Sequence, residues 1–78
     1  MTQTLYEEII RILEDYLGPS AKRFVDRQVA FHLQKLPSDI DLSEIPNFVE
    51  WTRVTLGLLT EDHAMVDECA DRLMALSH

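Results

Sequence analysis

The sequence has little of what most catalytic and ligand-binding signatures require. Of its 78 residues, one is cysteine and two are glycine. A single thiol excludes an internal disulfide, and the isolated Gly18 and Gly57 exclude a glycine-rich phosphate loop. No apolar run approaches the roughly 20 residues of a transmembrane helix. Disulfide scaffolds, phosphate-loop enzymes and membrane-spanning helices are therefore poor candidates.

The composition is that of one small folded domain. Hydrophobic residues make up 46% and charged residues 27%, which suits a globular chain rather than a disordered tail. The net charge of −7 repels nucleic-acid phosphates and anionic membrane surfaces. We expect neither a nucleic acid nor a membrane as partner. The N-terminus lacks the basic-then-apolar layout of a signal peptide, so we expect a cytoplasmic protein.

The first expected helix begins at Thr4. In the residues that follow Thr4, apolar side chains recur at three- and four-residue intervals. Thr4 and Glu7 have the spacing of a capping box, in which each side chain accepts from the backbone N–H of the other residue. Gly18 tolerates the left-handed conformation that ends a helix, and Pro19 suits the first turn of the next.

Three further helices are expected. One covers residues 19–36 and is closed by Pro37, one opens at Pro46 after a polar connector, and one is capped by Thr60. No segment alternates in the manner of a strand. The sequence predicts an all-α single domain over residues 1–78, either a compact four-helix bundle or an orthogonal four-helix array.

Spacing the residues at roughly 100° along each helix predicts the buried side chains. The second helix presents Ala21, Phe24, Val25, Val29, Leu33 and Leu36, with Gln28 and His32 inside the same arc. The third presents Phe48, Val49, Trp51, Thr55, Leu56, Leu58 and Leu59, with Val54 apart from them. The fourth presents Val66, Cys69, Ala70, Leu73 and Leu76.

The second helix carries the opposite charge to the rest of the chain. Residues 19–37 hold four of the seven basic residues and one acidic residue, a local charge of +3. Arginine and aromatic residues are enriched where proteins bind one another, so the strip of Arg23, Arg27, Phe31 and Gln34 is a candidate binding surface. The alternative is intramolecular: Asp26, Glu14 or the acidic fourth helix can pair with these arginines at the surface.

A second candidate site is a pocket around Gln28, His32 and Trp51. Gln28 and His32 lie on successive turns in the apolar arc, where Phe and Leu side chains would line a cavity for a small molecule. The structural alternative is a buried histidine whose ring donates to a carbonyl, since buried polar groups are normally hydrogen-bonded.

The remaining reactive residues do not form a catalytic or metal-binding set. His63, Asp67 and Asp71 lie along one helix face, but one histidine with two exposed carboxylates is a weak zinc site. Cys69 falls among apolar residues, where a thiol is inert. We expect no enzyme activity, no metal and no cofactor.

Two segments carry a family resemblance. The string Tyr16-Leu17-Gly18-Pro19-Ser20-Ala21-Lys22, followed by Phe24-Val25, resembles the opening of small helical modules attached to bacterial serine/threonine kinases and other signalling chains. The stretch from Ile45 through Trp51 to Leu59 and the acidic last helix are similar to short stand-alone helical proteins of cyanobacteria. The resemblance implies a regulatory or adaptor role in a bacterial cytoplasm.

The leading functional expectation is a non-catalytic protein-protein interaction or regulatory adaptor module that binds an acidic partner through its second helix. The first alternative is a homodimer or larger homo-oligomer, because the broad apolar arcs can exceed what so short a chain buries. The second is a small-molecule sensor that uses the pocket near His32.

Overall fold

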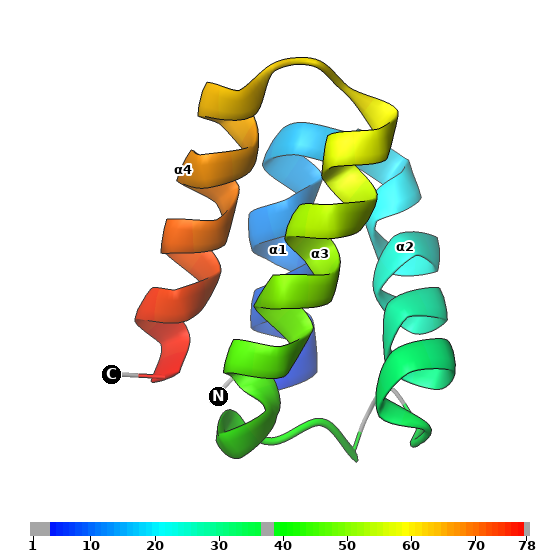
Figure 1. Ribbon diagram of the computed structural model, residues 1–78. Coiled ribbons are helices and arrows are strands. Elements are labelled where there is room, and N and C mark those ends of the chain that lie inside the picture. Colours follow the sequence, from blue (N-terminus) through cyan, green and yellow to red (C-terminus); the bar gives the residue numbers. More distant parts are fainter. Residues whose placement is uncertain (1–3, 37–38, 78) are drawn as a thin grey trace.

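The computed structural model describes residues 4–36 and 39–77 (Figure 1). These residues form helices and turns without a β-strand, which confirms the all-α prediction. The radius of gyration is 11.5 Å. A compact domain of this length is expected to have a radius of gyration of about 11.5 Å, so the fold is compact. None of the described helices combines the length and the apolar character needed to cross a membrane.

Helix α1 covers Leu5–Leu17 and has the predicted ends. The Thr4 hydroxyl oxygen accepts from the Glu7 backbone N–H at 3.2 Å. The same hydroxyl donates to the Glu7 carboxylate at 3.2 Å, a contact that replaces the expected return bond to the Thr4 backbone. At the other end, Gly18 closes the helix as predicted and donates its N–H to the Glu14 carbonyl. Its φ of +61° is positive, but its ψ of −140° differs from the left-handed helical conformation that the sequence suggests, and glycine adopts such a conformation readily.

The prediction of one regular helix over residues 19–36 is wrong, because the structure has three different helical segments here and they end earlier. A 3₁₀ turn at Gly18–Ser20 leads into α2, Ala21–Gln28, and a π-helical turn then covers Val29–Leu33. Gln34 adopts φ 54° and ψ 44°, the left-handed geometry that ends the helix. Because a π turn bonds i to i+5, it shifts the phase of the side chains that follow, and Leu36 is exposed rather than buried. The proposed stop at Pro37 lies outside the described residues.

Helix α3 covers Ile45–Leu59, one residue earlier than the Pro46 start that the sequence suggests. The connector before it holds a 3₁₀ turn, Leu42–Glu44. Asp41 caps this turn by accepting from the Ser43 N–H at 2.9 Å, while its own N–H donates to the Glu44 carboxylate at 3.2 Å. A reciprocal cap of this kind satisfies N–H groups that have no partner within the helix.

Helix α4 covers His63–Met74 and is capped by Asp62, not by Thr60 as predicted. The Asp62 carboxylate accepts from the Met65 N–H at 3.1 Å. Thr60 instead closes α3: its N–H donates to the Leu56 carbonyl, and its hydroxyl accepts from the Asp62 N–H at 3.1 Å. A 3₁₀ turn, Ala75–Ser77, follows α4.

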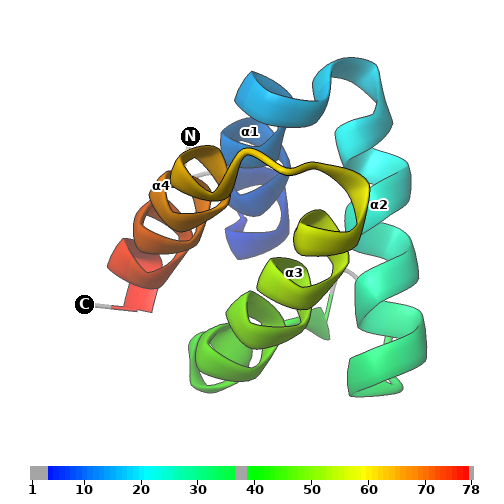
Figure 2. The same cartoon turned by 45° about the horizontal axis from the view of Figure 1, so that its top comes forward.

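In the assembled fold, α2 and α4 lie on opposite sides of the pair formed by α1 and α3 (Figures 1 and 2). Helices α3 and α4 pack along one another, as do α1 and α2. The outward side of α2 therefore has no neighbouring helix, and α2 and α3 form one continuous side of the molecule.

Most of the side chains that the sequence predicts to be buried lie in the core, but some do not. It is formed by Ile9, Leu13, Ala21, Val25, Val29, Ile40, Ile45, Phe48, Val49, Leu56, Val66, Cys69, Ala70 and Leu73. On α3, however, Trp51, Leu58 and Leu59 are exposed, and the prediction that they are buried is wrong. The buried face of α3 follows Phe48, Thr52 and Leu56 at four-residue steps, and the apolar residues beside that face have no helix to cover them.

Candidate functional site

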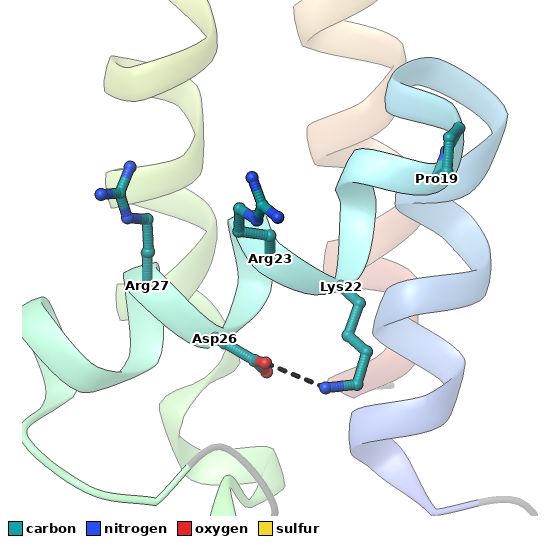
Figure 3. A pocket seen from close by; sticks show the side chains of 5 residues that line it. All are labelled: Pro19, Lys22, Arg23, Asp26 and Arg27. Atoms are coloured by element: carbon teal, nitrogen blue, oxygen red, sulfur yellow. Dashed lines mark hydrogen bonds and ion pairs between the residues drawn. The ribbon is translucent and has the colours of Figure 1, made fainter.

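Two arginines on α2 have no partner within the described part of the chain. Lys22, Lys35, Arg53 and Arg72 each form an ion pair with a carboxylate, at distances of 2.7 to 3.1 Å. Arg23 and Arg27 are exposed and form no ion pair or hydrogen bond with residues 4–36 and 39–77. Figure 3 shows both side chains projecting away from the Lys22–Asp26 pair. The intramolecular pairing that the sequence left open is therefore absent among these residues.

Asp26, the carboxylate nearest to these arginines in sequence, is already bound to two other groups. The Tyr6 hydroxyl donates to one of its oxygens at 2.5 Å, and the Lys22 ammonium donates to the other at 3.1 Å. Partial burial acts to raise the pKa of Asp26, but the hydrogen bonds from Tyr6 and Lys22 outweigh it and hold the pKa below its ordinary value. Burial, followed by the hydrogen bond to Asp26, raises the pKa of Tyr6.

Arg23 and Arg27 border two hollows. One lies on the outer side of α2, has a volume of about 370 Å³ and is lined by Pro19, Lys22, Arg23, Asp26 and Arg27 (Figure 3). The other lies between α2 and α3, has a volume of about 280 Å³ and is lined by Ser20, Arg23, Phe24, Arg27, Gln28, Thr55 and Leu59. We call the second hollow the α2–α3 groove. It combines cations with apolar side chains from two packed helices, whereas the outer hollow is formed by one stretch of chain.

Gln28 is a buried polar residue that lines the α2–α3 groove. It is 7% exposed, and its Oε1 has no hydrogen-bond partner among the described residues. Buried polar atoms are nearly always hydrogen-bonded, so this amide stands out. The Thr55 hydroxyl, by contrast, donates to the Trp51 carbonyl at 3.0 Å. The sequence placed Gln28 in a candidate pocket but with different neighbours.

His32 and Trp51 are brought together, but as a stack. Their ring centroids are 3.9 Å apart and the planes differ by 11°. A small molecule does not fit between two rings at this separation, and Gln28 lines the α2–α3 groove with other residues. This stack joins the π-helical turn after α2 to the middle of α3.

Exposed apolar side chains lie along the same two elements. Trp51, Val54 and Leu58 are 39%, 53% and 84% exposed and follow one another at three- and four-residue steps, which places them on one side of α3. Phe31, on the π-helical turn, is 72% exposed. Gln34, the last member of the predicted strip, is exposed where the turn ends. The sequence set Val54 apart from the core face and placed Trp51 at a candidate pocket, but it wrongly assigned Leu58 to the core. The apolar arcs that are too broad for so short a chain to bury were the signal for this exposure.

The burial that the sequence predicts for Cys69 is confirmed. Cys69 is fully buried, and this burial raises the pKa of its thiol to about 11. Asp67 is held by Arg53 at 2.7 Å. No group of three or more His, Cys, Asp or Glu side chains in the part of the chain that the structure describes is placed to hold a metal ion.

Comparisons with models of known protein families, with curated protein sequences and with solved structures give no match. The resemblance to helical modules of bacterial signalling kinases and to short cyanobacterial proteins therefore stays a prediction.

Proposed function

We propose that this protein is a non-catalytic interaction module, a compact four-helix bundle that binds an acidic segment of another protein through α2 and α3. The binding surface, here called the α2–α3 face, consists of Arg23, Arg27, Phe31, Gln34, Trp51, Val54, Leu58 and Leu59. The observation that carries the proposal is that Arg23 and Arg27 have no partner among the described residues, in a chain of charge −7.

The physical reason lies in the chain's own charges. Residues 4–36 and 39–77 hold an excess of carboxylates, yet none of them lies within ion-pair distance of Arg23 or Arg27. A guanidinium group binds a carboxylate with two parallel hydrogen bonds, which fixes the orientation of a partner. Exposed apolar side chains next to it supply the area that can be removed from water on binding. Charge thus selects and orients the partner, while Phe31 and Leu58 contribute most of the affinity.

Self-association is a second candidate, because the exposed Leu58, Leu59 and Phe31 are also suited to bind another copy. A two-fold dimer formed through the centre of the α2–α3 face would bring Arg23 and Arg27 of the two copies near one another. Like charges facing each other across an interface oppose association. We therefore expect a monomer, which sedimentation at increasing protein concentration tests directly.

Affinity capture tests the partner. The wild-type chain is compared in a native lysate with Arg23→Gln/Arg27→Gln and with the matched control Arg53→Gln/Arg72→Gln, which changes the net charge equally but at ion pairs beside α4. We expect a partner that wild type and control retain, that the first variant loses, and that moderate salt releases. Retention by all three folded chains would refute a role for Arg23 and Arg27.

A further inference from the structure

We propose that the α2–α3 groove is a carboxylate site: it receives an acidic side chain of the partner, with Arg23, Arg27 and the Gln28 amide as donors to the carboxylate and Phe24 and Leu59 as the apolar walls around its stem. This inference rests on the proposed function and specifies where, and by which chemistry, the partner is held.

The donor set identifies the charged end of the ligand. Arg23 and Arg27 are four residues apart on α2, which places them on successive turns of one side of the helix, and both line the groove. Gln28 follows directly, is buried, and has no hydrogen bond from its side chain to any described residue. An amide can present its N–H₂ group or its oxygen after a half-turn. Three polar groups without a partner among the described residues therefore line one small space, and two of them are cations.

The walls identify the rest of the ligand. Phe24 from α2 and Leu59 from α3 line the same groove, and Leu59 is 67% exposed. A hydrated phosphate ion would leave these apolar surfaces in contact with water, whereas the methylene groups of a glutamate or aspartate side chain would cover them. The volume of about 280 Å³ lies just below the range typical of cavities for small organic ligands. The groove thus suits one acidic side chain and its apolar neighbours.

A partner protein is the favoured source of that carboxylate, because Thr55, which lines the groove, lies one helical turn from Trp51 on α3, and Trp51, Val54 and Leu58 are all exposed. A free small acid would use the groove alone and leave this stripe in water. A second copy of this chain is a poorer source. Its acidic helices α1 and α4 expose no large hydrophobic residue among those described, so they cannot cover the stripe.

The chemistry of the groove is tested first with a defined probe. Isotope-labelled wild-type protein is titrated with phenylbutyrate, with the uncharged phenylbutyramide and with inorganic phosphate, while backbone amide shifts are recorded by NMR. We expect saturable shifts at residues 23–28 and 55–59 with phenylbutyrate, a dissociation constant on the order of millimolar, and binding at least about tenfold weaker for the amide. Equal binding of the amide, stronger binding of phosphate, no saturable shift, or shifts confined to α1 and α4 would each overturn the carboxylate site.

The source of the carboxylate is tested with two displayed libraries of short peptides, one with a fixed central glutamate and one with glutamine in its place. We expect selection on the wild-type protein to enrich glutamate-centred peptides with leucine, phenylalanine or tryptophan beside the acid. The selected peptides should displace phenylbutyrate and bind at least about tenfold more tightly than it does, because they also cover the α3 stripe. Equal enrichment from both libraries, or peptides that do not displace phenylbutyrate, would overturn the assignment to a partner side chain.

Variants separate this inference from the proposed function. Arg23→Gln/Arg27→Gln should abolish the phenylbutyrate shifts, and the control Arg53→Gln/Arg72→Gln should keep them. If phenylbutyrate binds as expected but no lysate partner depends on Arg23 and Arg27, the proposed function fails and the groove chemistry stands. If a partner depends on both arginines but does not compete with phenylbutyrate, the proposed function stands and the groove inference fails.

Discussion

His32 and Trp51 lie face to face, with 3.9 Å between their ring centroids and 11° between their planes. The contact joins the π-helical turn that follows α2 to α3. Because Trp51 remains 39% exposed, the stack is at the surface of the α2–α3 face rather than in the core. It is a direct side-chain contact between the π-helical turn and α3, and neither ring lines the α2–α3 groove.

We expect this stack to contribute measurably to stability. A double-mutant cycle with His32→Ala, Trp51→Ala and the combined variant should give a coupling of about 0.5–1.5 kcal/mol, the usual value for an aromatic pair. Urea unfolding, followed by far-ultraviolet circular dichroism because Trp51 is itself removed, measures each variant. Additive losses for the two single changes would show that the rings touch without stabilising each other.

The buried Gln28 Oε1, which has no hydrogen-bond partner among the described residues, should cost stability in the free protein. Replacing Gln28 with leucine removes this buried polar group and should stabilise the fold by about 1 kcal/mol. The same change should weaken phenylbutyrate binding several-fold, because one donor to the carboxylate is lost. Thermal unfolding and the NMR titration measure the two effects separately.

Thr52→Val is the matched control for this change. Thr52 is 1% exposed, and its hydroxyl oxygen also has no hydrogen-bond partner in the described residues, but it does not line the groove. We expect a gain in stability of about 1 kcal/mol with unchanged phenylbutyrate binding. A loss of binding in Thr52→Val equal to that in Gln28→Leu would mean that the effect is transmitted through packing rather than through the amide.

Asp26 should stabilise the fold in a manner that depends on pH. Its pKa is lower in the folded chain than its ordinary value of 3.8, so its contribution is fully present above that value and is lost as the pH falls through the folded pKa. Asp26→Asn should cost no more than about 1 kcal/mol near neutral pH, since the pair with Lys22 is open to solvent. The difference from wild type in urea unfolding should disappear in acid, and a difference that stays constant down to strong acid would contradict this account.

Cys69 provides a prediction at high pH. Burial raises the pKa of its thiol from the ordinary 9.0 to about 11, so folding favours the protonated form. The stability that this form contributes is complete below the ordinary pKa and is lost as the pH rises through the folded pKa. Relative to Cys69→Ala, wild type should lose up to roughly 2 kcal/mol near pH 11. Native thiol alkylation should be slow at mildly alkaline pH and rapid in denaturant, and fast native labelling would refute the burial.

The sequence predicted the helical class and the start and end of α1, because these depend on local features: periodic apolar residues, a threonine cap and a glycine end. It misplaced the start of α4, since Thr60 and Asp62 are both good caps and only the turn between helices decides which one is used. It also gave α2 extra length, because nothing in the periodicity marks the π-helical turn at Val29–Leu33.

On the proposed α2–α3 face, the sequence singled out the strip from Arg23 to Gln34 and the ring of Trp51, but it placed Leu58 and Leu59 in the core. The excess of positive charge identified Arg23 and Arg27 from the sequence, and the structure describes both as exposed and without a partner in its described residues. Leu58 and Leu59 could not be assigned in this way, because apolar residues look alike whether a neighbouring helix covers them or not. Tertiary packing decides which side of α3 is left without a neighbouring helix. The same packing creates the groove that Gln28 lines.

The most direct test of the central claim is to map the contact surface of the bound partner by NMR. The isotope-labelled protein is titrated with the partner captured from the lysate, in wild-type form and as Arg23→Gln/Arg27→Gln. Binding through the α2–α3 face should concentrate the amide shifts at residues 23–34 and 51–59, and the variant should bind at least about tenfold more weakly. Shifts concentrated on α1 and α4, or unchanged affinity of the variant, would contradict it.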